Sequence, residues 1–414
     1  MLKKRTVSVL LGLAMAICIF SAGCSFGGKD SKSQKTESDT KSESDMRNLF
    51  SDPETRMKVG EIQQYIDKYF YFDVDEEKQK EAIFRAVLSG LDDPYSEYYT
   101  AEEFTRMTED ISGTYVGIGA VVTQDVDGII SVVRPIKNSP AEEAGLQAGD
   151  ILVQVDDMEI QDQDLQEVVT KIRGQKDTEA YLKVVREGEA DFLEFHIKRR
   201  EVENYSVDYE MLEENIGYVQ VTEFLDKTFD EFKEAVDDLT SQGAKGFILD
   251  LRDNPGGLVN IASDMVAYFA DETKSKDGVI ISTEGKDGTL MDQYKDTDGH
   301  KVDLPVVILA NKNSASASEI FSGSMRDLTG AKLVGVTTFG KGIMQSVIRL
   351  SDGSGMKITV AKYFIPSGYD LHKVGLVPDY EVELPDKRQN AVNLDRKDDT
   401  QLDKAIEVLK EEMH

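Results

Sequence analysis

Residues 247–257 read Phe-Ile-Leu-Asp-Leu-Arg-Asp-Asn-Pro-Gly-Gly. The first five residues are almost continuously apolar, which is typical of a strand buried on both faces of a sheet. A Pro-Gly-Gly turn then interrupts the strand, and a helix is expected within residues 255–270. A second strand of the same kind, residues 306–310, leads into a helix expected over residues 316–328. Buried strands that alternate with helices predict an α/β core.

More elements of this core are expected between residues 201 and 385. Residues 228–239 have the apolar spacing of a helix, and Thr228 and Glu231 have the three-residue spacing of a capping box at its N-terminus. Further strands are expected at residues 217–224, 332–336, 346–350 and 357–364. Residues 386–414 are expected to form a C-terminal tail with an amphipathic helix.

Three short motifs precede this core in a fixed order. They are Tyr115-Val116-Gly117-Ile118-Gly119, SPAEEAGL at residues 139–146 and AGDIL at residues 148–152. With the strand-like runs around them, they resemble a PDZ domain over residues 113–200. PDZ domains bind peptide C-termini by strand addition, and loop N–H groups hold the carboxylate. The resemblance implies that Gly117, Ile118 and Gly119 form this loop; the alternative is that the glycines only make a turn.

The N-terminus has the pattern of an export signal. Residues 3–5 are basic, residues 7–20 are apolar, and Ser21-Ala22-Gly23 precedes Cys24. Gly23-Cys24 resembles a bacterial lipobox, which implies lipidation of Cys24; an uncleaved membrane anchor is the alternative. Both interpretations of residues 1–24 place the rest of the chain on the extracytoplasmic face of the bacterial cell membrane.

Two segments are expected to separate this signal from the PDZ domain. Residues 25–51 are rich in Ser, Lys, Asp and Glu and predict a disordered tether. Residues 52–112 contain apolar residues at helical spacing and predict an N-terminal helical region.

The composition excludes several classes of function. A formal net charge of −30 disfavours nucleic-acid binding. Both cysteines, Cys18 and Cys24, lie in the first 24 residues, so the folded part has no expected disulfide, cysteine-based metal site or catalytic thiol. The chain has four histidines, and of these only His372 lies where a catalytic base of the core could be tested.

A nucleophile is expected in Asn313-Ser314-Ala315-Ser316-Ala317-Ser318-Glu319, which follows a buried strand and opens a helix. N–H groups at a helix N-terminus stabilise developing negative charge. Ser314, Ser316 and Ser318 are all candidates on these grounds, and a serine-rich helix cap is the alternative. The Pro255-Gly256-Gly257 turn could supply further N–H groups for an oxyanion hole, or it could be only a tight corner.

The base of such a site can be a lysine, because burial disfavours the ammonium form and lowers the pKa. Gly340-Lys341-Gly342 places one lysine among apolar strands, and Gln345 follows four residues later. A simple turn is the alternative for this tripeptide. Residues 335–341 also match most of a P-loop, but Gly342 stands where the Mg²⁺-binding Ser or Thr would be, so nucleotide binding is rejected.

Together these elements resemble the C-terminal processing peptidases, or tail-specific proteases, of the S41 type. Five motifs carry the resemblance: residues 250–257, the serine segment, Lys341-x-x-x-Gln345, and the fragments at residues 363–368 and 375–379. The resemblance implies a multidomain α/β protein. Its parts would be N-terminal helices, an inserted β-rich PDZ domain of the α+β type, a crotonase/Clp-like protease core and a C-terminal helical tail.

The resemblance also implies roles for single residues. Ser316 would be the nucleophile of a Ser-Lys dyad, Lys341 its general base and Gln345 a supporting residue. The oxyanion would be held by Gly256 or Gly257 together with Ala317. The implied reaction is acyl transfer through an acyl-enzyme, with no metal or cofactor, on exported or membrane proteins near their C-termini.

Two further implications concern partners. Related peptidases use the PDZ domain as a gate that substrate C-termini displace. Arg173 stands where their sensor arginine is found, and a charge that faces the helix dipole is the alternative. A homodimer is expected from the long helical ends outside the core.

Overall fold

In a computed structural model, the protein is described at residues 17–19, 49–125, 128–270, 276–295, 302–385 and 396–413. Cys24, most of the expected export signal and most of the expected tether lie outside these ranges. Within them, no helix is both long enough and apolar enough to cross a membrane. The chain divides into two compact units, one of residues 20–92 and one of residues 1–19 and 93–414.

The smaller unit contains two helices, α1 (Pro53–Tyr69) and α2 (Glu76–Ser89), after the short 3-10 turn η2 (Leu49–Ser51). Asp52 and Asp75 cap the two helices, because their carboxylates accept the N–H groups of Thr55 and Lys78. Of all the residues in the two helices, only Leu88 is buried. Their apolar side chains are therefore largely exposed to solvent.

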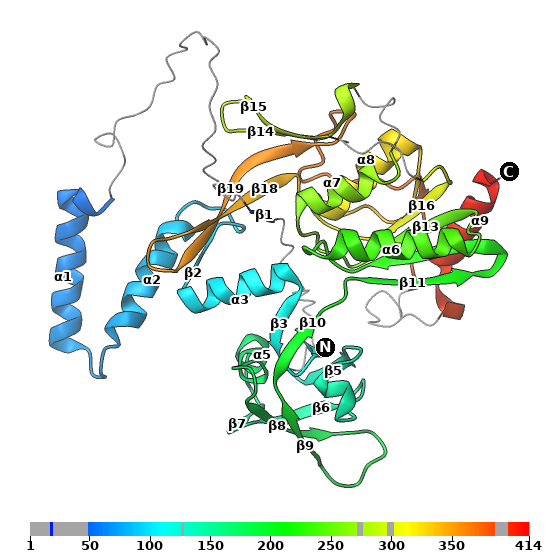
Figure 1. Ribbon diagram of the computed structural model, residues 1–414. Coiled ribbons are helices and arrows are strands. Elements are labelled where there is room, and N and C mark those ends of the chain that lie inside the picture. Colours follow the sequence, from blue (N-terminus) through cyan, green and yellow to red (C-terminus); the bar gives the residue numbers. More distant parts are fainter. Residues whose placement is uncertain are drawn as a thin grey trace, which may run out of the picture. The chain divides into compact units, whose positions relative to one another are not determined.

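The larger unit is built on a sheet in the order β11-β12-β13-β16-β17-β20, in which β11 is antiparallel and the other strands are parallel (Figure 1). The two central strands, β13 and β16, are buried along their whole length, which confirms the α/β core expected from their apolar runs. The strands are β11 (Val207–Leu212), β12 (Ile216–Val221), β13 (Gly246–Asp250), β16 (Val306–Ala310), β17 (Lys332–Gly335) and β20 (Tyr380–Glu381).

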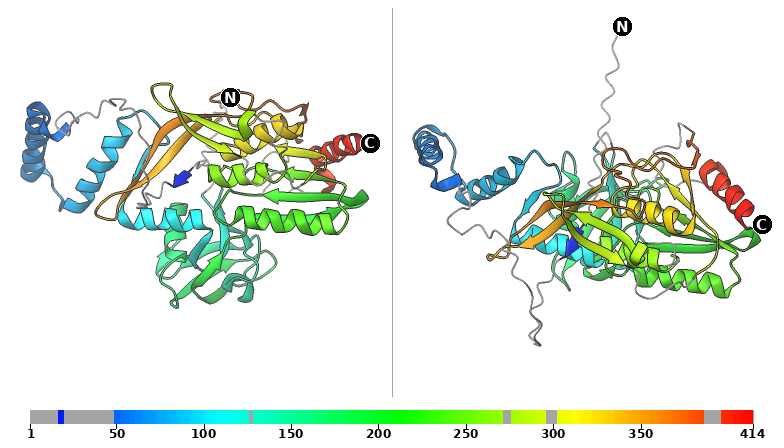
Figure 2. Two further views of the ribbon diagram at one scale, coloured as in Figure 1. Left: turned by 45° about the horizontal axis from the view of Figure 1, so that its top comes forward. Right: turned by 90° about the horizontal axis from the view of Figure 1, so that it is seen from above.

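Helices cover both faces of this sheet (Figure 2). On one face the side chains of α6 (Thr228–Ser241), α7 (Val259–Ala267) and α8 (Ala317–Thr329) pack with those of the sheet in one large apolar cluster. On the other face α9 (Thr400–Glu412) packs against β13 and β16. Buried ion pairs fix α9 in place, because Arg252 bonds both to Asp250 at 2.6 Å and to Asp399 before α9 at 2.8 Å.

The capping box expected at the start of α6 is wrong. The helix begins at Thr228 itself, and Lys227 is the N-cap. The Thr228 hydroxyl accepts the N–H of Leu225, while the Glu231 carboxylate accepts the N–H and hydroxyl of Ser206. The spacing of a capping box is present, but Thr228 bonds to the N–H of a residue before the helix and Glu231 bonds to the distant Ser206.

A second sheet lies beside the first and is built on a long antiparallel hairpin of β18 (Ile343–Arg349) and β19 (Gly355–Phe364). The short strand β2 (Glu97–Tyr99) pairs with β19, and α3 (Ala101–Ser112) follows it and buries its apolar face in the core. The remaining strands are β1 (Ile17–Ile19), β14 (Val279–Glu284) and β15 (Leu290–Lys295). Strand β2 was not expected, because three residues are too few to show a strand period.

Residues 114–203 form the β-rich part that the PDZ resemblance implies, and it has an apolar core of its own. Its sheet has the order β4-β5-β6-β8-β9, with β7 beside β6, and the pair β3–β10 joins it to the rest of the unit. The elements are β3 (Thr114–Gly117), β4 (Ala120–Gln124), β5 (Ile130–Pro135), α4 (Pro140–Glu143), β6 (Ile151–Val155), β7 (Met158–Glu159), α5 (Leu165–Ile172), β8 (Glu179–Val185), β9 (Leu193–Lys198) and β10 (Arg200–Glu203). Three further 3-10 turns are η3 (Glu213–Asn215), η5 (Lys276–Gly278) and η6 (Arg396–Asp398).

Candidate active site

Ser316 lies at the turn from β16 into α8, in a backbone conformation that non-glycine residues rarely adopt, with φ 58° and ψ −116°. The residue is fully buried, and its hydroxyl has no hydrogen-bond partner among the described residues. The neighbouring candidates differ. The Ser314 hydroxyl donates to the carbonyl of Leu251 at 2.7 Å, and the Ser318 hydroxyl donates to that of Asn254 at 2.9 Å. Physical contacts therefore separate three serines that the sequence left equivalent.

The buried carboxylate of Glu319, in the first turn of α8, connects this turn to the loop before β18. Its Oε2 accepts the N–H of Ser316 at 2.9 Å and that of Lys341 at 2.8 Å, so both N–H groups meet at one oxygen atom. Its Oε1 accepts the Gly340 N–H at 2.7 Å and the Thr338 hydroxyl. Burial raises the pKa of Glu319, and these four hydrogen bonds oppose the increase.

Glu319 was not recognised as a site residue from the sequence. The signal was present, since Ser316 and Glu319 have the Ser-x-x-Glu spacing of a capping box. In the fold the Glu319 carboxylate does accept the N–H of the N-cap residue, but it also binds a loop more than twenty residues away.

Lys341 is 1% exposed and lies in the loop that leads into β18. Burial, reinforced by the charge of Lys357, lowers the pKa of Lys341 to about 7. The amine Nζ lies 4.4 Å from the centre of the Tyr95 ring. The fully buried Tyr363 holds the backbone of the same residue, because its hydroxyl donates to the Lys341 carbonyl.

The glycines on both sides of Lys341 are required by close contacts. A Cβ at Gly342 would lie 2.8 Å from the backbone nitrogen of His372, and one at Gly340 would lie 2.9 Å from the nitrogen of Gly375. Residues 340–342 are therefore packed against the segment that carries His372. His372 is thus near the site, although its backbone rather than its ring makes this contact.

The other candidates for a base are less suitable. His196 is exposed and pairs with Glu179 at 2.9 Å, while His300 and His414 lie outside the described residues.

Gln345 is fully buried in β18, where its Nε2 donates to Thr359 at 3.1 Å and its Oε1 has no partner in the described part of the chain. No group of three or more His, Cys, Asp or Glu side chains in the described ranges is arranged to hold a metal ion.

The Pro-Gly-Gly turn lies directly against the turn that carries Ser316. A Cβ at Gly256 would lie 2.8 Å from Cβ of Ser316 and 3.0 Å from the nitrogen of Ala317, so only glycine fits there. The N–H of Gly256 already donates to Oδ1 of Asn254 at 2.8 Å. Ala317 is the first residue of α8, where the helix provides no acceptor for the N–H group. The N–H of Ala317 is therefore better placed than that of Gly256 to donate to a ligand.

Asn254 is a second residue that sequence reasoning missed. Its buried side chain donates to the Val221 carbonyl at 2.8 Å and accepts the Gly256 N–H. Its carbonyl accepts the Ala315 N–H at 3.1 Å. Asn254 thus joins β12, the glycine turn and the Ser316 turn into one rigid corner.

Of the predicted PDZ loop residues, Gly117 ends β3, and Ile118 and Gly119 form the connection to β4. Ile118 is fully buried, and Gly119 has φ 78° with no space for a Cβ against Ser139. Arg173 is the C-cap residue of α5; its guanidinium lies 4.5 Å from the centre of the Tyr115 ring and forms an ion pair with Asp110 of α3 at 2.6 Å.

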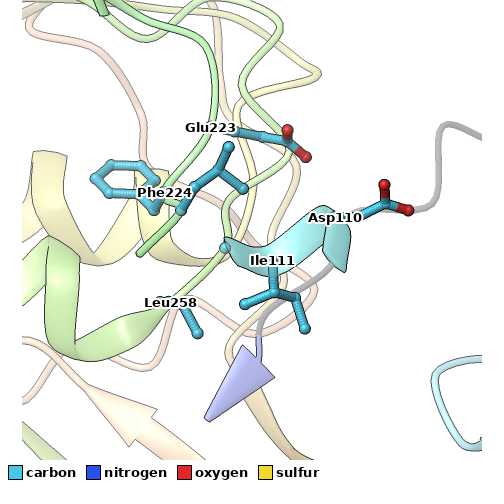
Figure 3. A pocket seen from close by; sticks show the side chains of 7 residues that line it. Asp110, Ile111, Glu223, Phe224 and Leu258 are labelled. Carbon is cyan, nitrogen blue, oxygen red and sulfur yellow. The ribbon is translucent and has the colours of Figure 1, made fainter. Parts of the chain in front are cut away.

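A small pocket connects Asp110 to the glycine turn (Figure 3). Asp110 and Ile111 at the end of α3 line one side, and Glu223, Phe224 and Leu258 line the other. Burial, with the charge of Asp110 as the second cause, raises the pKa of Glu223 to about 7. The Phe224 N–H donates to the carbonyl of Gly256 at 2.9 Å, so this pocket wall is bonded directly to the proposed oxyanion turn.

Comparisons with known proteins show the family to which the chain belongs. The model of peptidase family S41 matches residues 215–382, and a PDZ domain model matches residues 131–186. The carboxy-terminal processing protease CtpA of Bacillus subtilis is 38% identical over 329 residues, which are 80% of this chain and 69% of that protein. The chain belongs to the S41 peptidase family. It is a serine peptidase of the C-terminal processing group and carries a PDZ domain.

A second relative supports this assignment, and a solved structure shares the fold. A CtpA-like serine protease of Staphylococcus saprophyticus is 37% identical over a stretch that makes up 81% of this chain and 67% of that protein. A solved S41 protease structure from Bacteroides fragilis has the same fold, with a TM-score of 0.55 at 17% identity over 83% of this chain and 93% of that one.

The contacts of Glu319 predict the effect of changing it in this S41 peptidase. Glu319→Gln puts a donating amide where N–H groups converge, so we expect kcat to fall at least about tenfold and the free energy of unfolding to fall by about 2 kcal/mol. Peptide cleavage and urea unfolding measure the two effects. Asp327→Asn on the same helix is the matched control and should change neither by much. Wild-type kcat in Glu319→Gln would show that this carboxylate does not organise the site.

Proposed function

We propose that the chain is an endopeptidase that cleaves exported or membrane proteins near their C-termini with a Ser316–Lys341 dyad. The observation that carries the proposal is the Glu319 carboxylate, whose Oε2 accepts the N–H groups of both residues. The uncommitted Ser316 hydroxyl and the lowered pKa of Lys341 support it, because a general base works best when its pKa is close to the working pH.

In the proposed reaction, Oγ of Ser316 attacks the scissile carbonyl carbon while neutral Nζ of Lys341 takes the hydroxyl proton. The N–H groups of Gly257 and Ala317 hold the resulting oxyanion, and each such donor contributes about 3 kcal/mol in other enzymes. The C–N bond breaks as the Lys341 ammonium protonates the leaving amine. Water then attacks the acyl-enzyme, its proton passes to Lys341, and Ser316 recovers its proton when the ester bond breaks. Gln345 supports the dyad from β18.

We propose that the PDZ domain binds substrate C-termini at the Gly117-Ile118-Gly119 loop and gates the dyad through Arg173. Arg173 binds Asp110, Asp110 lines the pocket with Glu223, and the next residue, Phe224, bonds to Gly256. A ligand that draws Arg173 away from Asp110 would change the charge at one wall of this pocket. The oxyanion turn forms another wall of the pocket.

The expected export signal places the peptidase at the outer face of the cell membrane, with lipidated Cys24 as its proposed anchor. We propose in addition that α1 and α2 associate with a second copy of the chain. Side chains such as those of Met57, Tyr65 and Phe84 are exposed on these helices, and burying them is favourable. In this proposal the two domains expected from the sequence have separate roles: the PDZ domain, at residues 113–200, binds the substrate, and the core, at residues 201–385, carries the dyad.

The dyad can be tested on an unstructured protein with an apolar C-terminus. We expect Ser316→Ala and Lys341→Ala each to lower kcat/KM by at least about 1,000-fold, because either change removes the proton transfer. His372→Ala should retain activity within a few-fold, since this histidine serves no step. Substantial cleavage by Lys341→Ala would rule out the dyad, and loss of activity in His372→Ala alone would favour a histidine-dependent hydrolase.

The gate predicts that Arg173→Ala reduces the preference for substrates with a free apolar C-terminus. The quantity to compare is kcat/KM for two peptides that differ only in an amidated or free C-terminus. Lys171→Ala, two residues earlier and paired with the exposed Asp157, is the control and should keep the preference. If Arg173 only complements the helix dipole, Arg173→Ala will lower stability and leave the ratio of the two rates unchanged.

The anchor predicts that Cys24→Ala releases the protein from the membrane, whereas the matched Cys18→Ala does not. Fractionation of cells that express each variant, followed by mass measurement of the N-terminus, gives the answer. An unlipidated Cys24→Ala protein that stays in the membrane with its signal uncleaved would instead establish the N-terminus as an anchor.

A further inference from the structure

A second buried lysine lies close to the proposed dyad and has no part in the reaction described above. Lys357, the third residue of β19, is 2% exposed. Its Nζ forms an ion pair with Oε2 of Glu97 at 3.1 Å and lies 5.7 Å from the centre of the Tyr99 ring. A charged side chain is rarely so buried without a specific partner, and here the partner comes from the short strand β2.

The strand register places this lysine beside the site. Gln345 is directly opposite Thr359 in the β18–β19 pair and bonds to its side chain. Because side chains alternate along a strand, Lys357 is on the same face of β19 as Thr359, about 7 Å along the strand. That face therefore holds both the supporting glutamine and the second lysine.

The segment that leads into β2 contacts both amines. Lys341 Nζ lies against the ring of Tyr95, and Lys357 Nζ bonds to Glu97, two residues further on. The Ser96 hydroxyl accepts the N–H of Thr359, which fixes this segment along β19. The two lysine amines thus contact residues only two positions apart, Tyr95 and Glu97, in the same short segment of the chain.

The charges that face Lys341 come from three elements. Lys357 of β19 disfavours its ammonium form, whereas Asp93 before β2 and Glu319 of α8 favour it; the nearby Tyr95 and Tyr363 are titratable. After burial, Lys357 is the largest cause of the lowered pKa of Lys341. Glu97 does not cancel this effect, because its side chain is 40% exposed and water screens its charge more than that of Lys357.

We propose that Lys357 is a positioning residue for the reaction: its buried positive charge keeps the amine of Lys341 unprotonated, ready to accept the Ser316 proton. The inference rests on the proposed dyad and adds to it the source of the base's neutrality. Glu97 and Tyr99 hold Lys357 in place, so a segment far away in the sequence serves the active site through electrostatics. A second cation beside a catalytic amine is an established physical means of keeping that amine neutral.

The test is the pH dependence of kcat/KM. The wild-type acid limb is expected near pH 7, where Lys341 loses its proton. Lys357→Met removes the neighbouring charge, so the limb should move up by about one pH unit. Activity at pH 7 should then fall about five- to tenfold and recover above pH 9. Lys357→Arg keeps the charge and should keep the limb. Asp93→Asn removes an opposing charge and should move the limb to lower pH.

The outcomes separate this inference from the dyad itself. Lys357→Gln, which can still bond to Glu97, repeats the test if Lys357→Met does not fold. The role of Lys357 would be overturned if the acid limb of kcat/KM did not move in Lys357→Met and Lys357→Gln. It would also be overturned if Lys357→Arg moved the limb as far as these neutral variants do. Either result would leave the dyad intact. Activity in Lys341→Ala would contradict the proposed dyad itself, whether or not the acid limb moves in the Lys357 variants.

Discussion

The hydrogen bonds that converge on Glu319 hold the site of this S41 peptidase together. One carboxylate oxygen accepts the N–H of Ser316 and that of Lys341, and the other accepts the Gly340 N–H and the Thr338 hydroxyl. A buried carboxylate is costly unless its acceptor sites are filled, so its stability depends on keeping these groups together. The strained backbone of Ser316 is tolerated for the same reason, because it presents an N–H group to this oxygen.

The remaining parts of the site are arranged around this carboxylate. Asn254 fixes the glycine turn against the Ser316 turn, and Tyr363 fixes the backbone of Lys341. The lysine amine is thereby held in a buried position where its neutral form is favoured. The site thus holds two buried groups with different electrostatic surroundings: a carboxylate with four hydrogen-bond donors, and an amine whose pKa is lowered by burial and by the charge of Lys357.

Much of this could be predicted from the sequence, and the limits have physical causes. The strands β13 and β16 were evident because full burial gives continuous apolar runs. The three serines could not be separated from the residues alone, since their difference lies in hydrogen bonds to Leu251 and Asn254. The S41 resemblance selected Ser316, and the contacts favour the same residue.

Other features depend on pairings distant in the sequence. Lys357 and Glu97 are 260 residues apart, and no local pattern connects them. The capping box expected for Thr228 and Glu231 is wrong, whereas at the equal spacing of Ser316 and Glu319 the Glu319 carboxylate does accept the N–H of Ser316. Local spacing therefore indicated what a side chain can do, and tertiary contacts decided which of its partners it takes.

The position of α9 sets an order of assembly. This helix covers one face of β13 and β16, and the Arg252–Asp399 pair ties it to the residues just before the glycine turn. Yet it is translated after every strand of the core. During vectorial synthesis, one face of the central sheet stays uncovered until α9 has been made. The last covering layer of β13 and β16, and the Arg252–Asp399 ion pair with it, therefore forms only after the rest of the core has been synthesised.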